Sequence, residues 1–314
     1  MRVLVSEKIH PSGMEMLKNA GYEIVTLNER SQAELTEKIK DVDALLVRIM
    51  DISEEMMRSN PNLKIISKHG VGMDNIDMEA AKKLGIAVTC TLSANSQSVA
   101  EHTWAMIMAL ARNLTISSNL YKEIGFAAKA NSPLGAEVYG KTLGIFGIGR
   151  IGKRVARIGV NAFDMKVLAY DPYVDPKDVP AGVELVSDKD RIFREADFIT
   201  LHCPANAETR HMIGEREFGM MKPEVRFINC ARGPIVDEAA LIKALEERKI
   251  WAAGLDVTEK EPCDADSLLL NSPYVILTPH FGGSSVEGAT RVSTTAAQNI
   301  IDFFENKEIE GRLV

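Results

Sequence analysis

A glycine-rich turn, Gly147-Ile148-Gly149-Arg150-Ile151-Gly152, lies near the middle of the chain. Glycine lets the backbone turn tightly and approach a phosphate group closely, because it has no side chain to obstruct the approach. A helix that follows the turn would offer the unpaired backbone N–H groups of its first residues to an anion. The spacing is typical of a loop that binds the pyrophosphate of a dinucleotide, although such a turn also arises by chance.

The segments around this turn match a strand–helix–strand unit. Apolar runs over 142–146 and 166–170 predict two buried strands, and helical spacing over 153–161 predicts a helix between them. Asp171 follows the second strand and lies 19 residues after Gly152, a separation at which a carboxylate can hold a ribose diol. The complete unit favours dinucleotide binding over a chance turn.

Three residues farther along the chain could act on a small substrate beside such a cofactor. Arg232 lies in the segment 229–233, Glu261 in the acidic segment 256–262, and His280 in the turn 278–283. Each segment follows a predicted strand, so we expect the three side chains at one edge of one sheet. An imidazole can exchange a proton, a carboxylate can orient it, and a guanidinium can anchor a carboxylate. Singly, each has an ordinary alternative: a surface ion pair, an exposed acid and a capping histidine.

The elements that would position these residues alternate between strand and helix. Strand-like runs recur through the first ninety residues, and six more are predicted at 143–146, 167–170, 198–202, 226–229, 252–256 and 275–277. This alternation predicts α/β architecture with largely parallel sheets, and the six later strands predict a Rossmann domain. A helical stretch over 99–123 has a wide apolar face, which predicts burial between domains or between subunits.

The composition argues against several other classes of function. The chain has 314 residues, 46% of them hydrophobic, which suits two globular domains. Its net charge of −7 gives no support for nucleic-acid binding. The four cysteines form no C-x-x-C pair, so we predict neither a metal site nor a disulfide scaffold. The chain opens on a strand pattern and has no long apolar run, so we expect no signal peptide, no membrane partner and a cytoplasmic location.

The chain resembles the D-isomer-specific 2-hydroxyacid dehydrogenases, and most closely their D-3-phosphoglycerate dehydrogenase branch. Seven motifs carry this resemblance in order, at 70–77, 98–102, 147–152, 201–204, 229–233, 256–262 and 278–283. The resemblance implies a Rossmann dinucleotide-binding domain, residues 99–285, inserted in a smaller flavodoxin-like α/β substrate domain, residues 1–98 plus 286–314. It also implies that the substrate binds in a cleft between the two.

By this resemblance the chain is an NAD-dependent oxidoreductase acting at C2 of a small anionic 2-hydroxy or 2-keto acid. Arg232 would hold the substrate carboxylate, His280 would exchange the proton, and Glu261 would hydrogen-bond the imidazole and favour its protonated form. Asp171 favours NAD over NADP, because a carboxylate repels a 2′-phosphate. The expected cofactor contacts are Gly147, Gly149, Arg150, Ile151, Gly152, Asp171, His202, Cys203, Pro204, Thr209, Cys230, Ala231, Asp256, Gly282 and Gly283.

The resemblance is less specific for the substrate. Arg48 and Lys68 fall where the phosphoglycerate branch, which belongs to serine biosynthesis, places cations that face a phosphate; Val71 and Gly72 would offer backbone N–H groups to the carboxylate. The segment Lys68-His69-Gly70 replaces the commoner Arg-Ala-Gly, so hydroxypyruvate, glyoxylate and other short 2-keto acids compete with phosphohydroxypyruvate. A homodimer is expected, and a C-terminal regulatory domain of the kind found in longer members is not.

Two rival interpretations differ in class. A short-chain dehydrogenase would need a Tyr-x-x-x-Lys pair on a helix; Tyr173 and Lys177 have this spacing, but Pro172 and Pro176 predict a loop there. A non-enzymatic NAD sensor or corepressor would share the fold without needing the Arg, Glu and His set.

Overall fold

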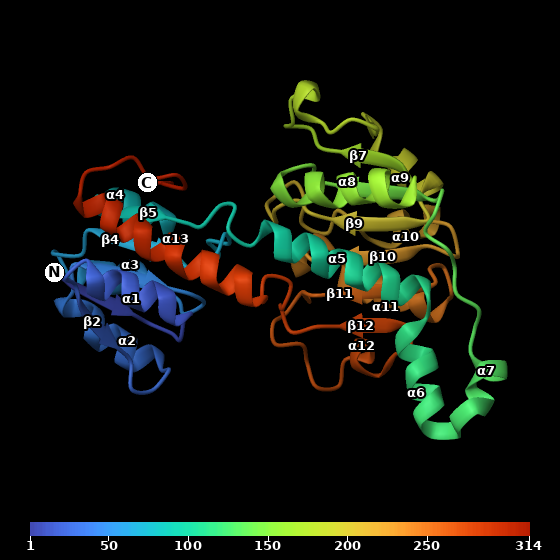
Figure 1. Ribbon diagram of the computed structural model, residues 1–314, viewed down its shortest axis with the longest axis horizontal. Coiled ribbons are helices and arrows are strands. Elements are labelled where there is room, and N and C mark those ends of the chain that lie inside the picture. Colours follow the sequence, from blue (N-terminus) through green and yellow to red (C-terminus); the bar gives the residue numbers. More distant parts are fainter. The chain divides into compact units, whose positions relative to one another are not determined.

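The computed structural model describes every residue from Met1 to Val314 and divides into two compact units (Figure 1). Unit 1 comprises Met1–Asn95 together with Ser284–Val314, and unit 2 comprises Ser96–Gly283. The boundaries expected after residues 98 and 285 lie a few residues farther along the chain than these.

Unit 1 is built on a five-stranded parallel sheet in the order β2-β1-β3-β4-β5. Its strands are β1 (Arg2–Val5), β2 (Glu23–Thr26), β3 (Ala44–Val47), β4 (Ile65–Lys68) and β5 (Ala87–Thr89). Its helices are α1 (Pro11–Asn19), α2 (Gln32–Lys38), η1 (Ile39–Asp41), α3 (Glu54–Arg58), α4 (Met78–Leu84) and α13 (Val286–Phe304). The strand order 2-1-3-4-5 is that of flavodoxin-like folds, as predicted.

Helices cover both faces of this sheet because its strands are apolar on both sides. Val3 and Val5 of β1 pack on one face with Ala296 and Ile300 of α13, while Leu4 packs on the other face with residues of α2, α3 and α4. In Figure 1 the red helix α13 lies beside the blue helix α1. The last long helix of the chain therefore completes the core of the sheet that the first residues begin.

Unit 2 is built on a seven-stranded parallel sheet in the order β12-β11-β10-β9-β6-β7-β8. Its strands are β6 (Thr142–Phe146), β7 (Lys166–Tyr170), β8 (Val183–Leu185), β9 (Phe198–Leu201), β10 (Arg226–Asn229), β11 (Ala252–Leu255) and β12 (Val275–Leu277). Six of the strands are those predicted. From β8 to β11 the order is that of a Rossmann domain, and β12 is one further strand at the opposite edge from β8. The seventh, β8, was not predicted, because it is short, lies at the edge and is only partly buried.

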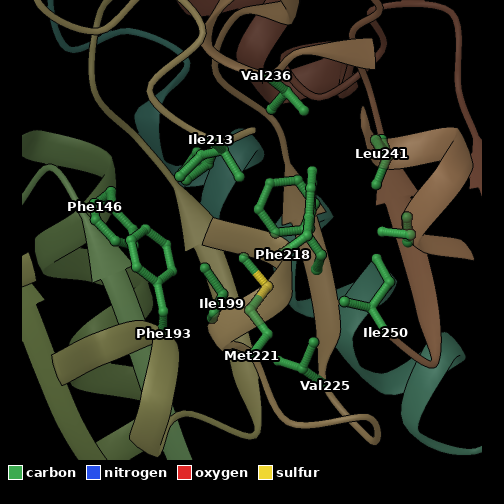
Figure 2. Packing of buried hydrophobic residues seen from close by; sticks show 14 of the residues in the cluster. Phe146, Phe193, Ile199, Ile213, Phe218, Met221, Val225, Val236, Leu241 and Ile250 are labelled. Atoms are coloured by element: carbon green, nitrogen blue, oxygen red, sulfur yellow. The ribbon is translucent and has the colours of Figure 1, made fainter. Parts of the chain in front are cut away.

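The helices of unit 2 form one layer on each face of the sheet. They are α5 (Ser96–Ala111), α6 (Leu114–Ile124), η2 (Gly125–Ala127), α7 (Ala128–Asn131), α8 (Arg150–Phe163), η3 (Pro176–Asp178), α9 (Lys189–Glu195), α10 (Glu215–Met220), η4 (Gly233–Ile235), α11 (Glu238–Glu246) and α12 (Leu268–Asn271). Figure 2 shows one layer, where Phe146 stacks on Phe193 of α9 at 5.0 Å and Phe218 of α10 packs nearby. On the other face α5 and α8 pack against alternate residues of β6, Leu143 and Ile145. The central strands of the sheet are thus buried on both faces, whereas its edge strands β8 and β12 are only partly buried.

The single helix predicted over 99–123 is wrong: the structure has two helices, α5 and α6. Asn113 separates them in a left-handed conformation with φ 50°. Its side-chain amide donates to the carbonyl of Leu134 at 3.0 Å and accepts from Trp251 Nε1 at 3.1 Å. Asparagine adopts this conformation more readily than most residues, and these bonds hold it there, so the apolar pattern continues while the helix does not.

No helix meets the length and apolarity needed to cross a membrane.

Candidate active site

The glycine turn connects β6 to α8, and two of its glycines are required by the fold itself. Gly147 has φ +90°, and a Cβ there would lie 2.7 Å from the backbone nitrogen of Cys203. A Cβ on Gly152 would lie 2.1 Å from the carbonyl oxygen of Gly147. Both distances are far below ordinary contact, so only glycine allows α8 to pack this closely against the strand ends.

Gly149 is different, because a Cβ there would meet no protein atom within 4 Å. Gly149 is the N-cap of α8, with φ −73°, and no side chain caps the helix; Arg150 and Ile151 are its first residues. The fold does not explain this glycine, whereas close approach of a pyrophosphate to an uncapped helix N-terminus does. The turn therefore fits a dinucleotide.

Asp171 follows β7 and holds the glycine turn from the side. One carboxylate oxygen accepts from Ile148 N at 2.9 Å, and the other accepts from Tyr173 N at 3.0 Å. A carboxylate oxygen has two lone pairs, so each oxygen keeps capacity for a second donor such as a ribose hydroxyl. Tyr173, which has the Tyr-x-x-x-Lys spacing of a short-chain dehydrogenase, lies outside any helix, as its flanking prolines predicted.

His202 and Cys203, which follow β9, lie beside the glycine turn at Gly147. His202 donates its backbone N–H to Phe146 O at 2.7 Å, and its Nε2 lies 3.1 Å from Thr200 Oγ1. Its Nδ1 is buried without a hydrogen-bond partner, and burial lowers the imidazole pKa to about 3, so the ring is neutral. Burial also raises the pKa of Cys203 to about 11, which makes this thiol unsuited to nucleophilic chemistry. Thr209 lies on the exposed loop that follows and donates to Pro204 O at 2.6 Å.

Arg232 lies on a tightly constrained loop after β10. Asn229 receives a hydrogen bond from Ala231 N at 3.0 Å and donates to Arg232 O at 3.0 Å, so one side chain spans the turn. A Cβ on Gly233 would lie 1.8 Å from Thr258 O, so this loop presses against the segment that leads to Glu261. The guanidinium donates from Nη1 to Ala231 O at 2.7 Å. Cys230, at the start of the loop, is buried, and burial raises its pKa to about 12.

His280 and Glu261 form the contact that the sequence predicts. His280 Nδ1 lies 2.9 Å from Glu261 Oε2, and the two side chains are 51% and 42% exposed. A carboxylate at Nδ1 selects the tautomer with its proton there and leaves Nε2 available to a substrate. His280 has φ 52°, which is uncommon for a residue with a side chain. Its backbone N–H is held by the carbonyls of Asp256 and Thr278, both at 2.9 Å.

Asp256, at the end of β11, organises the loop that carries His280. Its carboxylate accepts from Thr278 Oγ1 at 2.5 Å, from Phe281 N at 2.6 Å and from Gly282 N at 2.8 Å. Burial alone would raise the pKa of this carboxyl, but hydrogen bonds from His102, Thr278 and the loop amides outweigh it and lower the pKa. Asp256 is 3% exposed and its carboxylate faces the loop, so its expected contact with the cofactor stays a prediction.

One residue near this loop was missed by sequence reasoning. His102, on α5, places Nε2 at 3.1 Å from Thr278 Oγ1 and at 3.4 Å from Asp256 Oδ1. It lies in the segment 98–102, but its position inside an apolar helix gave no sign of a polar role. Its partners are far away in the sequence, so spacing could not reveal the contact.

The predicted substrate residues of unit 1 differ in their surroundings. Arg48 follows β3 and is exposed, and its backbone N–H donates to Glu7 Oε2 at 2.7 Å. Lys68 is the last residue of β4 and is 6% exposed, and its ammonium donates to Arg48 O and to Asn75 Oδ1. The ammonium of Lys68 is therefore held by groups of unit 1 and is not exposed to solvent. Val71 is exposed on the loop after β4 and Gly72 is partly exposed beside it.

Within unit 2, the structure brings Arg232, Glu261 and His280 to loops that follow three neighbouring strands, β10, β11 and β12. The glycine turn follows β6 at the same carboxyl edge of this parallel sheet. No group of three or more His, Cys, Asp or Glu side chains is arranged to hold a metal ion. The site therefore consists of a turn that fits a dinucleotide, a carboxylate–imidazole pair and an arginine.

Comparison with known proteins agrees with this geometry. Residues 104–282 match the family model described as "D-isomer specific 2-hydroxyacid dehydrogenase, NAD binding domain". The chain is 42% identical over 303 residues to a D-3-phosphoglycerate dehydrogenase of Methanocaldococcus jannaschii, covering 96% of this chain and 57% of that protein. It is 39% identical to a hydroxypyruvate reductase of Thermotoga maritima, covering 95% and 97%.

A solved structure of a glyoxylate reductase from Paecilomyes thermophila superimposes with a TM-score of 0.89 at 30% identity, covering 100% of this chain and 98% of the other. The chain spans little more than half the length of the curated phosphoglycerate dehydrogenases that it matches. The family match covers more than half of the chain and includes the glycine turn, Arg232 and Glu261. This chain belongs to the D-isomer-specific 2-hydroxyacid dehydrogenase family and carries its NAD-binding domain.

Proposed function

We propose that this protein is an NAD-dependent D-2-hydroxyacid dehydrogenase. The observation that carries the proposal is the 2.9 Å pair of His280 and Glu261 at the same sheet edge as the glycine turn. A proton-exchanging imidazole beside a dinucleotide turn is what the interconversion of a hydroxyl and a carbonyl requires. A corepressor or sensor that only binds NAD would have no use for this pair.

Each of the three residues has a distinct role in the proposed reaction. When bound, NAD supplies the hydride acceptor at its nicotinamide, and NADH supplies the hydride in the reverse direction. Arg232 holds the substrate carboxylate through its planar guanidinium, which can pair both oxygens. In the reduction, His280 gives its Nε2 proton to the oxygen at C2, and in the oxidation it accepts that proton. Glu261 holds Nδ1, which orients the ring so that Nε2 is available to the substrate.

For the substrate we propose 3-phosphoglycerate and 3-phosphohydroxypyruvate, with hydroxypyruvate or glyoxylate as the alternative. The names of several curated relatives, at 36–42% identity, support the phosphorylated pair. Arg48 is exposed and is the candidate for contact with a phosphate, and Val71 and Gly72 are candidates for backbone contact with the carboxylate. The hydrogen bonds of the Lys68 ammonium within the protein favour the unphosphorylated substrates. Lys68 and Arg48 are the two cations proposed to bind a phosphate, and the Lys68 ammonium already donates to protein oxygens.

A kinetic comparison tests the reaction and the substrate together. NADH oxidation is followed with 3-phosphohydroxypyruvate, hydroxypyruvate and glyoxylate at the same salt concentration. We expect turnover with at least one of them, with the highest kcat/KM for the phosphorylated acid. His280→Ala should lower kcat by roughly 10² to 10⁴-fold and leave NADH binding nearly unchanged. A protein that binds NADH but reduces no 2-keto acid would be a sensor rather than an enzyme.

We also propose that the protein forms a homodimer through α6, η2 and α7. These elements extend away from the sheet of unit 2 (Figure 1), and none of the residues of α6 is buried. Large apolar side chains are exposed there and on the segment that follows: Leu114, Tyr121, Ile124, Phe126, Leu134 and Tyr139. Apolar surface of this kind is typical of a subunit interface. A monomeric mass by light scattering at micromolar concentration would contradict the proposal.

A further inference from the structure

The loop that carries His280 is hydrogen-bonded to His102 of α5, a histidine to which the proposed reaction assigns no role. His102 Nε2 lies 3.1 Å from Thr278 Oγ1, two residues before His280. On the other side of His280, a Cβ added to Gly282 would lie 3.6 Å from His102 Cδ2, so the ring lies near the loop there as well. His102 therefore hydrogen-bonds the loop before His280 and lies near it after His280.

The hydrogen bonds around Thr278 have only one consistent direction. Asp256 is an acceptor only, so at 2.5 Å the Thr278 hydroxyl donates its single proton to that carboxylate. The same hydroxyl can then only accept from His102, which must carry a proton on Nε2. The result is a directed chain from His102 through Thr278 to Asp256, and Asp256 in turn receives Phe281 N and Gly282 N.

We propose that His102 is a positioning residue for His280. When His102 donates to Thr278 Oγ1, the hydroxyl proton of Thr278 points to Asp256. This hydrogen bond keeps the Asp256 carboxylate in the position where it accepts from Phe281 N and Gly282 N. The loop then keeps His280 at φ 52°, a backbone conformation that is unfavourable for a residue other than glycine. In this conformation Nδ1 lies against Glu261. The inference rests on the proposed function, because it assumes that His280 exchanges the proton with the substrate.

The test uses the full chain and compares His102→Leu with His102→Gln, whose amide nitrogen can replace the Nε2 donor. We expect His102→Leu to lower kcat by roughly 10- to 100-fold with little change in the KM for NADH, since misplacing an acid–base group by about 1 Å has this effect. His102→Gln should recover most of the loss. Thr278→Val breaks the same chain from the other side and should match His102→Leu. Glu101→Ala, an exposed change on the same helix, is the control and should behave as wild type.

Amide hydrogen exchange gives a readout that does not need activity. In His102→Leu the amides of Phe281 and Gly282 should exchange roughly two- to tenfold faster, since a hydrogen bond is worth about 0.5 to 1.5 kcal/mol. Wild-type kcat and wild-type exchange in both His102→Leu and Thr278→Val would overturn the proposal. A loss of kcat in His102→Leu that persists in His102→Gln would also overturn it, because His102 would then act through packing and not through its hydrogen bond. If the wild-type enzyme reduces no keto acid, the proposed function fails, while the exchange rates still decide whether His102 holds the loop.

Discussion

Replacing Gly149 by alanine separates the effect on cofactor binding from the effect on folding. Gly149 is the one glycine of the turn at which a Cβ would meet no other atom of the protein. A Cβ at Gly149 meets nothing within 4 Å and φ is −73°, which alanine adopts readily. Alanine is a poorer N-cap than glycine by up to about 1 kcal/mol, but it also restricts the unfolded chain by about 0.4 to 1 kcal/mol. The two effects oppose each other, so we expect stability to change by less than about 1 kcal/mol.

Gly152→Ala is the matched control, with the opposite expected outcome. Its Cβ would lie 2.1 Å from Gly147 O, so the helix must move away from the strand. Overpacking of this kind costs about 3 kcal/mol or more. For a unit of this size, that lowers Tm by roughly 6 to 12 °C, whereas Gly149→Ala should shift Tm by no more than about 4 °C.

The assay is a fluorescence titration with NADH beside a thermal unfolding curve. For Gly149→Ala we expect NADH to bind roughly 10- to 100-fold more weakly, equivalent to about 1.4 to 2.7 kcal/mol, since the methyl group occupies the space where the pyrophosphate must approach. Wild-type affinity in a normally folded Gly149→Ala protein would refute the reasoning. It would mean that the cofactor does not approach this turn.

Three further changes test cofactor selection, substrate selection and the pH dependence of stability. Asp171→Ala should weaken NADH binding and reduce the preference for NADH over NADPH, as measured by the ratio of their dissociation constants; an unchanged ratio would remove Asp171 from cofactor selection. Arg48→Ala should lower kcat/KM for 3-phosphohydroxypyruvate at least roughly tenfold more than for hydroxypyruvate, whereas Lys68→Met should affect both substrates alike, because Lys68 binds the protein itself. Burial lowers the pKa of His69 to about 4 and that of His202 to about 3, so below about pH 6.5 the unfolded chain binds more protons and stability falls with the pH. Each histidine should lower the free energy of unfolding of its unit by about 2 kcal/mol between pH 7 and pH 5, and denaturant unfolding of His202→Gln should show a smaller loss for unit 2 than wild type.

The sequence predicted the parts of the fold that depend on local pattern. The glycine turn, the strand on either side of it and Asp171 could be found because a dinucleotide unit fixes their spacing within one short segment. The strands before Arg232 and His280 could be found because each contains a short apolar run, Phe227-Ile228 in β10 and Val275–Leu277 in β12. The predicted pair of His280 with Glu261 is present in the structure, although its catalytic role stays a prediction.

What the sequence did not predict depends on contacts between distant residues. Strand β8 has only three residues at a sheet edge, where little burial is needed and the apolar signal is weak. The break at Asn113 is held by Trp251 and by the carbonyl of Leu134, neither of which is near in the sequence. Lys68 had the position of a substrate-binding cation, but only the structure shows Asn75 and the Arg48 carbonyl around its ammonium. His102 gave no signal because its partners come from the far end of unit 2.

The place of α13 in the chain has a consequence for biosynthesis. Strands β1 to β5 are made before unit 2, yet the face of their sheet that carries Val3 and Val5 is covered by Ala296 and Ile300, which are made after unit 2. Unit 2 is continuous and can fold while translation proceeds, whereas unit 1 must wait for α13 with an apolar face open to solvent or to a chaperone. The nascent chain is therefore most exposed to aggregation after unit 1's sheet has been made and before α13 has been made. A chain released from the ribosome before α13 would lack the helix that covers this face of the sheet.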